Sequence, residues 1–285
     1  MEAYLSIAGI TWRVELPEGT RWTSHGTLAE FLVEKPDGVD HTLTLGFCDE
    51  LPAPEGEAIY RSPDKQLFRS GDRRIQYRGA VEKNLGGAYM CLHRQGDHTR
   101  GFLKEANFRG EIAAKAVLHA LEPEQRLAAK SGVILHAAWI RRQGRAILFT
   151  APSGVGKSTQ ADLWCRLRGA ELVNGDRAAV FADGQARGIP FAGSSGVCKN
   201  ETMPIEAIVC LSQAPKTTIA PLKGFRAFRS IWEGCSVASL EREEARKALE
   251  TVTALLDRVP VYHLACTPDE SAVIALEQLL EKEEG

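Results

Sequence analysis

The stretch Ala151-Pro152-Ser153-Gly154-Val155-Gly156-Lys157-Ser158-Thr159 decides the fold around it, because it has the glycine and lysine spacing of a phosphate-binding loop. The apolar run 146–149 before it is typical of a buried strand, and residues 160–167 after it are typical of a helix. Strand, loop and helix in this order are the context that the motif requires. We therefore predict that residues 153–159 bind the phosphates of a nucleotide.

The chemistry expected of this loop follows from its backbone and from two side chains. Successive backbone N–H groups surround phosphate oxygens at the positive end of the following helix. Lys157 would reach the outer phosphates, and the Ser158 hydroxyl would ligate Mg²⁺. Ala151 replaces the first glycine of the usual pattern, whereas Gly154 and Gly156 keep the centre of the loop flexible.

Composition narrows the class of protein. The 285 residues are 44% hydrophobic and 25% charged, as in ordinary globular proteins. A net charge of −2 gives no indication of a nucleic-acid or membrane partner. Seven cysteines without a C-x-x-C pair argue against a disulfide framework or a zinc site. The sequence shows no secretory signal pattern and no apolar run of the roughly 18 residues that span a membrane, so we expect a cytoplasmic protein.

The first part of the chain, residues 1–108, differs from the rest. Short alternating runs separated by Pro- and Gly-containing turns indicate strands at 4–10, 11–16, 42–47, 58–60 and 88–92. This pattern predicts a β-rich N-terminal module. Two roles remain open for it: recognition of a peptide or partner by strand addition at a sheet edge, or support of the following domain by packing.

Residues 109–285 alternate between helical and strand patterns. A polar hairpin turn at 141–145 joins two strands just before the loop, which predicts a mixed or antiparallel sheet rather than the parallel sheet of common phosphate-loop folds. Residues 169–181 are typical of a strand, a tight turn and a second strand. The other expected elements are a helix at 110–121, strands at 133–140, 205–211 and 261–264, and helices at 240–258 and 268–284.

Asp176 and His136 are the candidates for metal and proton chemistry. Asp176 follows Gly175 in the expected turn, at a distance from the loop that suits a metal ligand on a second strand, although an ordinary turn aspartate has the same pattern. His136 ends a strand expected beside the loop strand, where a neutral imidazole accepts a hydroxyl proton, orients Asp176, or is simply a hydrogen-bonded buried histidine. The remaining histidines show no metal-ligand spacing: His25, His41, His93, His98, His119 and His263.

Taken together, these motifs resemble the catalytic domain of HPr kinase/phosphorylase over roughly residues 110–285. The resemblance is even closer to HPr-kinase-related proteins of peptide-modification clusters, among them the kinases that phosphorylate the C-terminal serine of lasso-peptide precursors. It rests on segments 134–138, 142–145, 153–158, 174–177 and 193–196, with Asn200 and Pro204 before a strand. It implies a phosphate-loop domain on a mixed sheet, similar to phosphoenolpyruvate carboxykinase, and ATP with Mg²⁺ as cofactors.

Two positions depart from that family. Its loop normally keeps the glycine that Ala151 replaces here, and its turn after the loop helix usually carries two adjacent aspartates, one for metal and one as base. This chain has Gly175-Asp176. Either Asp176 ligates the metal while another group takes the proton, or Asp176 is the base and Mg²⁺ is held by Ser158, phosphates and water. The phosphorylase activity of the family is not expected here.

We therefore expect an α/β protein that transfers phosphate from ATP to a serine hydroxyl of a peptide or small protein. Asp176, His136 and Lys157 are the expected catalytic residues, and Ser158 and Asp176 the metal ligands. The expected acceptor-binding residues are Arg177, Ser194, Ser195, Lys199 and Asn200. The alternatives are a kinase of free serine or another small metabolite, and a nucleotide-binding regulator without transfer activity. The resemblance also implies a homo-oligomer, since related kinases are often multimers.

Overall fold

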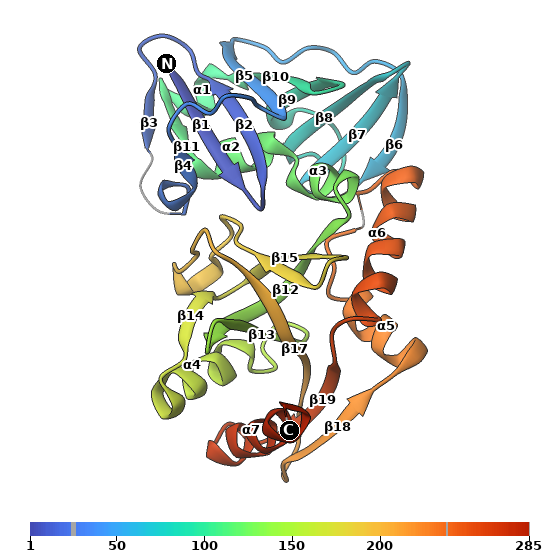
Figure 1. Ribbon diagram of the computed structural model, residues 1–285. Coiled ribbons are helices and arrows are strands. Elements are labelled where there is room, and N and C mark those ends of the chain that lie inside the picture. The colour runs from blue at the N-terminus through green and yellow to red at the C-terminus, as the bar shows by residue number, and fades with distance from the viewer. Residues whose placement is uncertain (24–26, 238, 285) are drawn as a thin grey trace. The chain divides into compact units, whose positions relative to one another are not determined.

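The computed structural model describes residues 1–23, 27–237 and 239–284 and divides into two compact units, Met1–Pro123 and Glu124–Gly285 (Figure 1). We call them the N-terminal unit and the C-terminal unit. The N-terminal unit extends past residue 108, because helix α2 (Ala114–Leu121) packs against strands β10 (His98–Lys104) and β11 (Glu111–Ala113).

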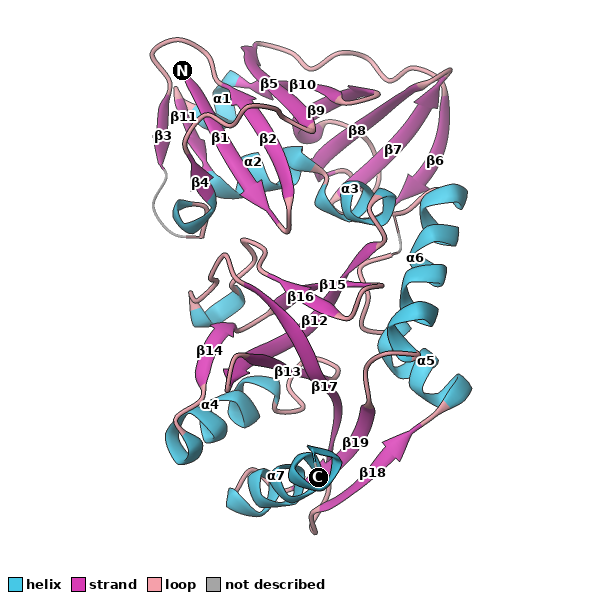
Figure 2. Ribbon diagram, in the orientation of Figure 1, coloured by secondary structure: helices cyan, strands magenta, loops and turns pink. Residues whose placement is uncertain are grey.

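Strands make up most of the N-terminal unit (Figure 2). Within its described residues, nine of them form one mixed sheet in the order β4-β1-β2-β5-β10-β9-β8-β7-β6, and β11 pairs with β3. Neighbouring strands are antiparallel except for β2–β5 and β5–β10. The remaining elements are β1 (Glu2–Ile7), β2 (Ile10–Glu15), β3 (Arg21–Thr23), η1 (Ala29–Phe31), β4 (Leu32–Val33), β5 (His41–Cys48), β6 (Glu57–Arg61), β7 (Lys65–Ser70), β8 (Arg73–Ala80), β9 (Gly87–Gln95) and α1 (Glu105–Phe108).

Alternating burial marks some of these strands and is absent from others. In β2, Ile10, Trp12 and Val14 are buried while the residues between them are partly exposed, which is the period-2 pattern of a strand with one covered face. In β8, five consecutive residues from 74 to 78 are buried, two of them arginines, so no alternation marks the strand. The helix expected over 110–121 begins only at Ala114, because residues 111–113 pair with β3 as a strand.

The C-terminal unit also contains a mixed sheet, of eight strands in its described residues. The order is β13-β12-β15-β16-β17-β19-β18, with β14 paired to β12, and β13 pairs with β17 as well. Strands β13, β17 and β19 are parallel, whereas β12 is antiparallel to β13. The elements are α3 (Pro123–Ala129), β12 (Gly132–Arg142), β13 (Arg145–Thr150), α4 (Lys157–Arg168), β14 (Glu171–Asn174), β15 (Arg177–Phe181), β16 (Gln185–Arg187), η2 (Gly193–Ser195), β17 (Thr202–Gln213), β18 (Thr218–Leu222), α5 (Gly224–Trp232), α6 (Arg242–Leu256), β19 (Val261–Cys266) and α7 (Glu270–Glu284).

The hairpin before the glycine loop is present as expected. β12 and β13 pair from Arg142 opposite Arg145 to Ala137 opposite Thr150. The two turn residues, Gln143 and Gly144, both have positive φ, 49° and 77°, which is the backbone of the tightest hairpin turns. The mixed sheet and the β-rich N-terminal region predicted from the sequence are therefore confirmed.

Helices cover both faces of the C-terminal sheet (Figure 1). Along β13, Ala146 and Leu148 join one hydrophobic cluster while Ile147 and Phe149 join another, because alternate side chains of a strand point to opposite faces. Helices α5 and α6 complete the first cluster, and α4 and α7 complete the second. The loop strand is thus buried on both sides and holds the loop that follows it at the end of a rigid element.

The two strands expected within residues 169–181 are present as β14 and β15, but a bend at residues 175–176 joins them in place of the expected tight turn. β14 and β15 both run antiparallel to β12, with Asn174 opposite Trp139 and Arg177 opposite His136, and a register shift interrupts the β14 pairing between Trp139 and Ile140. Between them the Ala137 N–H donates to the Asp176 carbonyl oxygen at 3.0 Å. Asp176 therefore lies in a bend within one continuous strand path and faces β12, rather than at the tip of a turn.

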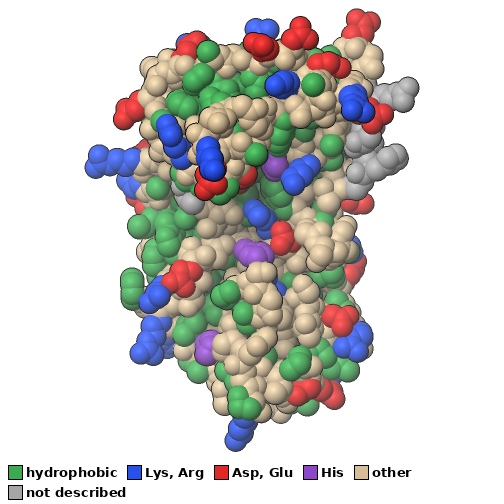
Figure 3. Space-filling model, turned by 180° about the vertical axis from the view of Figure 1, so that it is seen from behind, with side chains coloured by type: hydrophobic (Ala, Val, Ile, Leu, Met, Phe, Trp, Pro, Cys, Tyr) green, Lys and Arg blue, Asp and Glu red, His purple; other side chains and the backbone are tan. Residues whose placement is uncertain are grey.

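In the described parts of the chain, no helix combines the length and the apolar composition that crossing a membrane requires. Figure 3 shows Lys and Arg side chains interspersed with Asp and Glu side chains over the visible face. This mixture of signs agrees with the net charge of −2.

Candidate functional site

The glycine loop joins the end of β13 to the start of α4, in the strand–loop–helix arrangement expected from the sequence. Gly154 and Gly156 have φ of 80° and 124°, a backbone that residues with a side chain rarely adopt. Ala151 is not among the described residues with positive φ, so the side chain at this position causes no backbone strain. The loss of the first glycine is therefore compatible with the loop conformation.

Lys157 is the first residue of α4 and its side chain turns back over the loop. It is 8% exposed, and its Nζ donates to the carbonyl oxygens of Ala151 at 3.0 Å and Pro152 at 3.4 Å. Burial lowers the pKa of Lys157, and the charge of Asp176 raises it in part. The lysine therefore lies close enough to Asp176 for their charges to interact, and carbonyl oxygens of its own loop hold its ammonium group.

His136, Asp176 and Arg177 meet beside this lysine. The distance from His136 Nε2 to Asp176 Oδ1 is 3.2 Å, and Arg177 Nε lies 3.2 Å from Asp176 Oδ2. Burial lowers the pKa of His136, the Lys157 ammonium lowers it further, and Asp176 opposes both. The imidazole is therefore mainly neutral at neutral pH. Because Nε2 faces a carboxylate, the proton of neutral His136 belongs on Nε2, which leaves Nδ1 as the basic nitrogen.

Backbone contacts fix the position of His136 on both sides. Its N–H donates to the Gly234 carbonyl at 2.9 Å, and its own carbonyl accepts from the Thr150 hydroxyl at 2.9 Å. On the other edge it is paired with Arg177 of β15. The end of the loop strand, the neighbouring strand and the segment after α5 therefore all hold this residue.

Asn174 shapes the bend that presents Asp176, and the sequence analysis did not identify it. Its side chain is fully buried, and Oδ1 accepts from the backbone N–H groups of Asp176 at 2.9 Å and Arg177 at 3.0 Å. Its Nδ2 donates to the Ile189 carbonyl at 2.9 Å. An asparagine before Gly-Asp signals such a local cap, since short amide side chains bond backbone N–H groups two residues on.

The small-residue loop packs directly on this bend. A Cβ at Gly193 would lie 2.7 Å from Asp176 Cβ, and a Cβ at Gly175 would lie 2.1 Å from Ser195 Oγ. The Ser195 hydroxyl donates to the Ala192 carbonyl at 2.7 Å and accepts from the Val197 N–H at 3.2 Å. Ser195 therefore occupies the space that a side chain at position 175 would need, so the packing of this bend requires glycine there.

The expected acceptor residues are only partly gathered. Arg177 contacts Asp176, stacks its guanidinium 5.1 Å from the Phe191 ring centre and reaches the Ser236 hydroxyl at 3.4 Å. Ser194 lies exposed in η2 beside Ser195. The Lys199 ammonium is instead paired with the Glu171 carboxylate at the start of β14, and Asn200 is exposed.

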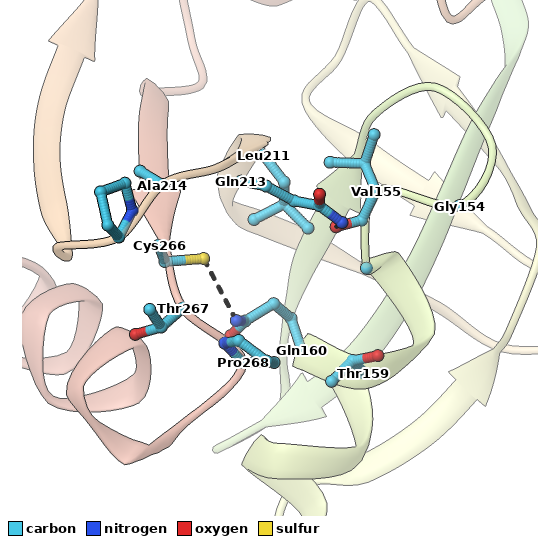
Figure 4. Close-up of a pocket in the computed structure, with 12 residues that line it drawn as sticks. Gly154, Val155, Thr159, Gln160, Leu211, Gln213, Ala214, Cys266, Thr267 and Pro268 are labelled. Atoms are coloured by element: carbon cyan, nitrogen blue, oxygen red, sulfur yellow. Dashed lines mark hydrogen bonds between the residues drawn. The ribbon is translucent and has the colours of Figure 1, made fainter.

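Two cavities flank the glycine loop. One, of about 600 Å³, is lined by the loop, the start of α4 and the carboxyl ends of β17 and β19 (Figure 4). The other, of about 390 Å³, is lined by His136, by Ala151 and Pro152 of the loop, by β17 and by the end of α5. The sequence analysis had indicated neither, because each combines residues from elements far apart in the chain.

Metal-binding groups are sparse. Within the described ranges, no three His, Cys, Asp or Glu side chains cluster as a preformed metal site. His25 lies outside the described residues. The Ser158 hydroxyl at the exposed start of α4 and the single Asp176 carboxylate are both oxygen donors, which suit Mg²⁺ because it keeps most of its waters and needs few protein ligands.

These features define an α/β protein whose mixed sheet carries a glycine-containing loop between a strand and a helix, with a histidine–aspartate pair near the loop lysine. The chain belongs to the ScmC family: the family model described as SynChlorMet cassette protein ScmC matches residues 114–281. A search of curated proteins finds no match. The matched region contains the glycine loop, His136 and Asp176, and it leaves out residues 1–113.

Proposed function

We propose that this protein is an ATP- and Mg²⁺-dependent kinase that phosphorylates a serine hydroxyl of a peptide or small protein. The observation that supports it most is the meeting of Lys157, His136 and Asp176 at one end of a glycine loop with the backbone of a phosphate-binding loop. Phosphoryl transfer depends mainly on positioning and on neutralising charge, and this arrangement combines a cation, a base and a carboxylate.

The donor would be held by the loop 153–159. Its backbone N–H groups and the positive end of α4 suit phosphate oxygens, and the 600 Å³ cavity beside it has room for a nucleoside. Ser158 and Asp176 are the proposed Mg²⁺ ligands. When bound, ATP with Mg²⁺ supplies the phosphoryl group: the acceptor oxygen forms a bond to phosphorus as the bond to ADP breaks. Lys157 stabilises the phosphate charge and exchanges its carbonyl partners for phosphate oxygens.

The proton of the acceptor hydroxyl passes to Nδ1 of His136 in this proposal. Burial and Lys157 keep the pKa of His136 low, so the imidazole is neutral and ready to accept a proton at neutral pH. Asp176, 3.2 Å from Nε2, stabilises the imidazolium that forms. Arg177 orients the Asp176 carboxylate through its 3.2 Å contact, and it is also a candidate to bind a carboxylate or phosphate of the acceptor.

The 390 Å³ cavity is the proposed place for the acceptor. His136, Thr150, Ser230 and Glu233 line it beside the loop residue Pro152, so a hydroxyl that enters it lies next to the proposed base. This volume admits one amino-acid side chain with part of its backbone, as a peptide end would present. The same volume also suits free serine, the main alternative acceptor. The resemblance to HPr kinase, with its carboxykinase-like fold, supports a protein or peptide acceptor.

A nucleotide-binding regulator without transfer activity is the second candidate, and one observation favours it. The second aspartate of the resembling kinases is absent, and Ser195 fills the space next to Gly175 where its side chain would lie. A protein without phosphoryl-transfer activity would not need that second aspartate.

The test uses γ-labelled ATP with Mg²⁺ and three conditions: a serine-containing peptide pool, free serine and no acceptor. Lys157→Ala and Asp176→Asn run beside Lys216→Ala and Asp183→Asn, which change exposed residues of the same kinds. We expect label on peptide serine that is lost in the first pair and retained in the second. Label on free serine alone would refute the peptide kinase and favour a kinase of a small metabolite. Bound ATP without label on any acceptor would refute the kinase and favour the regulator.

A further inference from the structure

A further cavity, of about 300 Å³, lies at the start of α5. β18 leads into this helix, which packs against α6 (Figure 1). The end of β18, the first turn of α5, the end of α6 and the segment 259–262 line the cavity. Its walls include the apolar Leu222, Leu256 and Val261, and Lys223 is the one charged residue among the described residues that line it. We call it the α5 cavity, and we call the 390 Å³ cavity the acceptor cavity.

One stripe along α5 joins these two cavities. Lys223 and Ala227 line the α5 cavity, whereas Ser230 and Gly234 line the acceptor cavity. These positions are four, three and four residues apart, which is the spacing of neighbours on one face of a helix. The same side of α5 therefore borders both cavities.

Strands β18 and β19 connect the cavities along a second path. Leu222 pairs with Val261 at the α5 cavity, and two residues along each strand Ala220 pairs with His263, which lines the acceptor cavity. Because alternate residues of a strand point to the same face, both pairs lie on one face of the sheet. Ala220 is exposed and His263 is half-buried, so the surface between the two cavities is open to solvent at this pair.

The separation of the cavities determines how long a peptide must be to reach both. Along α5, the residues that line one cavity lie on average about seven to eight positions from those that line the other, which is roughly 11 Å at the rise of a helix. An extended peptide advances about 3.3 Å per residue. It therefore covers this separation in about three residues.

Two cations lie along the way. Lys223 lines the α5 cavity, and Arg226, one helical turn before Ser230, is exposed. Neither side chain forms an ion pair within residues 1–23, 27–237 and 239–284. The carboxylate at the acceptor cavity, Glu233, is paired with Arg229 at 2.7 Å, which offsets its charge. A peptide that lies between the cavities therefore meets two positive charges, which favour an acidic side chain.

We propose that this side of α5 binds the acceptor peptide next to its serine. An apolar side chain about three residues from the serine enters the α5 cavity, and an acidic residue between them pairs with Lys223 and Arg226. The inference rests on the proposed function, since it places the serine in the acceptor cavity. It defines the acceptor as an extended peptide with an acidic residue and an apolar anchor on one side of the serine.

The experiment uses alanine-based peptides with one central serine. Leucine is placed singly at each of the four positions before and after the serine, and Asp or Lys is then placed between the best leucine and the serine. Label from γ-labelled ATP with Mg²⁺ gives kcat/KM. We expect leucine about three residues away on one side to raise kcat/KM roughly 10-fold over alanine, as burial of one apolar side chain implies. Asp should exceed Lys roughly 3-fold, and less at about 0.5 M salt.

Variants of the α5 cavity test the apolar contact. Leu222→Trp and Leu256→Trp both fill the cavity, so the preference for leucine should fall to about one in each. Thermal melting shows that each variant is folded, and the two substitutions lie on different elements. Phe225→Ala changes a side chain of α5 that is 76% exposed and lies outside the stripe, so this control keeps the wild-type preference.

Charge reversal tests the ionic contact. Lys223→Glu/Arg226→Glu should make Lys the better residue between leucine and serine. Lys216→Glu makes the same change of charge at an exposed lysine between β17 and β18, and it should leave the preference for Asp in place.

Peptide binding without ATP separates this inference from the proposed function. Fluorescence anisotropy compares labelled peptides that carry leucine and Asp with their alanine versions, in both orientations around the serine. Label on serine without any preference for leucine about three residues away, or preferences that persist in all cavity and charge variants, overturns the inference and leaves the kinase standing. Binding with these preferences but no label refutes the kinase and supports the peptide surface. Neither label nor binding overturns both.

Discussion

Replacement of Gly175 by alanine tests how the site is built. A Cβ at this position would lie 2.1 Å from Ser195 Oγ and 2.5 Å from Ser195 Cβ, both shorter than the contacts that Cβ atoms make with non-bonded atoms. Rotation of the hydroxyl relieves the first contact only. The Cβ of Ser195 is fixed to the backbone, so the short helix η2 must move away from the bend that carries Asp176.

The expected cost follows from these contacts. Forcing an extra methyl into a packed position costs about 1–3 kcal/mol. Movement of Ser195 also weakens its hydrogen bonds to the Ala192 carbonyl and the Val197 N–H, at about 0.5–1.5 kcal/mol each. Gly175 is not among the described residues with positive φ, so backbone strain adds nothing. We expect Gly175→Ala to lower the free energy of unfolding by about 2–6 kcal/mol.

A double-mutant cycle separates this contact from other effects. Ser195→Gly removes the obstructing Cβ, so Gly175→Ala/Ser195→Gly should be about as stable as Ser195→Gly alone. Ser195→Ala keeps the Cβ and should rescue little. Urea denaturation, with the m-value checked for each variant, gives the free energies. Additive effects in the cycle, or a loss below about 0.5 kcal/mol for Gly175→Ala, would refute the packing described here.

Three further predictions concern titration and catalysis. The pKa of His136 is lowered, so the transfer rate should be constant near neutral pH and fall only below pH 6.5. His136→Gln should lower kcat roughly 100-fold and abolish that fall. A transfer rate that already declines above pH 7 would contradict the assignment of His136 as the base. Burial lowers the pKa of His119 in the N-terminal unit to about 4. Below pH 6.5 this histidine is therefore protonated in the unfolded chain but still neutral in the folded chain. Up to about 3 kcal/mol of folding stability should be lost as the pH falls from 6.5 to 4. His119→Gln should flatten that part of the stability curve and exposed His98→Gln should not; equal curves for all three would exclude the histidine as the cause. Arg177→Lys should raise KM for the acceptor more than for ATP, since Arg177 is the proposed acceptor contact; an equal rise in both would assign it to Asp176 alone.

Local patterns predicted the parts of the fold that depend on neighbouring residues. The glycine loop, the hairpin at 141–145 and the alternating strand β2 each carry their signal within a few residues, and the structure has all three. The final helices were also expected, because their apolar spacing lies within one element. The sequence did not predict which strand pairs with that of His136. His136 was expected at the end of its strand, whereas it lies inside β12, opposite Arg177 of β15.

The rest depended on contacts between distant segments. The first turn of the expected helix at 110–121 is a strand, because its partner β3 lies ninety residues earlier in the chain and pairing overrides local propensity. Gly175 looked like a tight-turn glycine, yet Ser195 requires it through a contact twenty residues away. Gln160 follows the loop motif with no pattern of its own. Its Nε2 donates to the sulfur of Cys266, 106 residues further along the chain, and its Oε1 has no hydrogen-bond partner among the described residues.

The central claim is phosphoryl transfer at the glycine loop, and one measurement tests it most directly. Wild-type protein and Lys157→Ala are incubated with γ-labelled ATP, Mg²⁺ and the serine-containing peptide pool. The assay temperature lies below the measured melting temperature of both proteins, so that both are folded. We expect label on peptide serine from the wild type and at least about 100-fold less from Lys157→Ala, because the lysine stabilises the phosphate charge. Absence of label from wild-type protein that binds ATP, or equal label from both proteins, would contradict the claim.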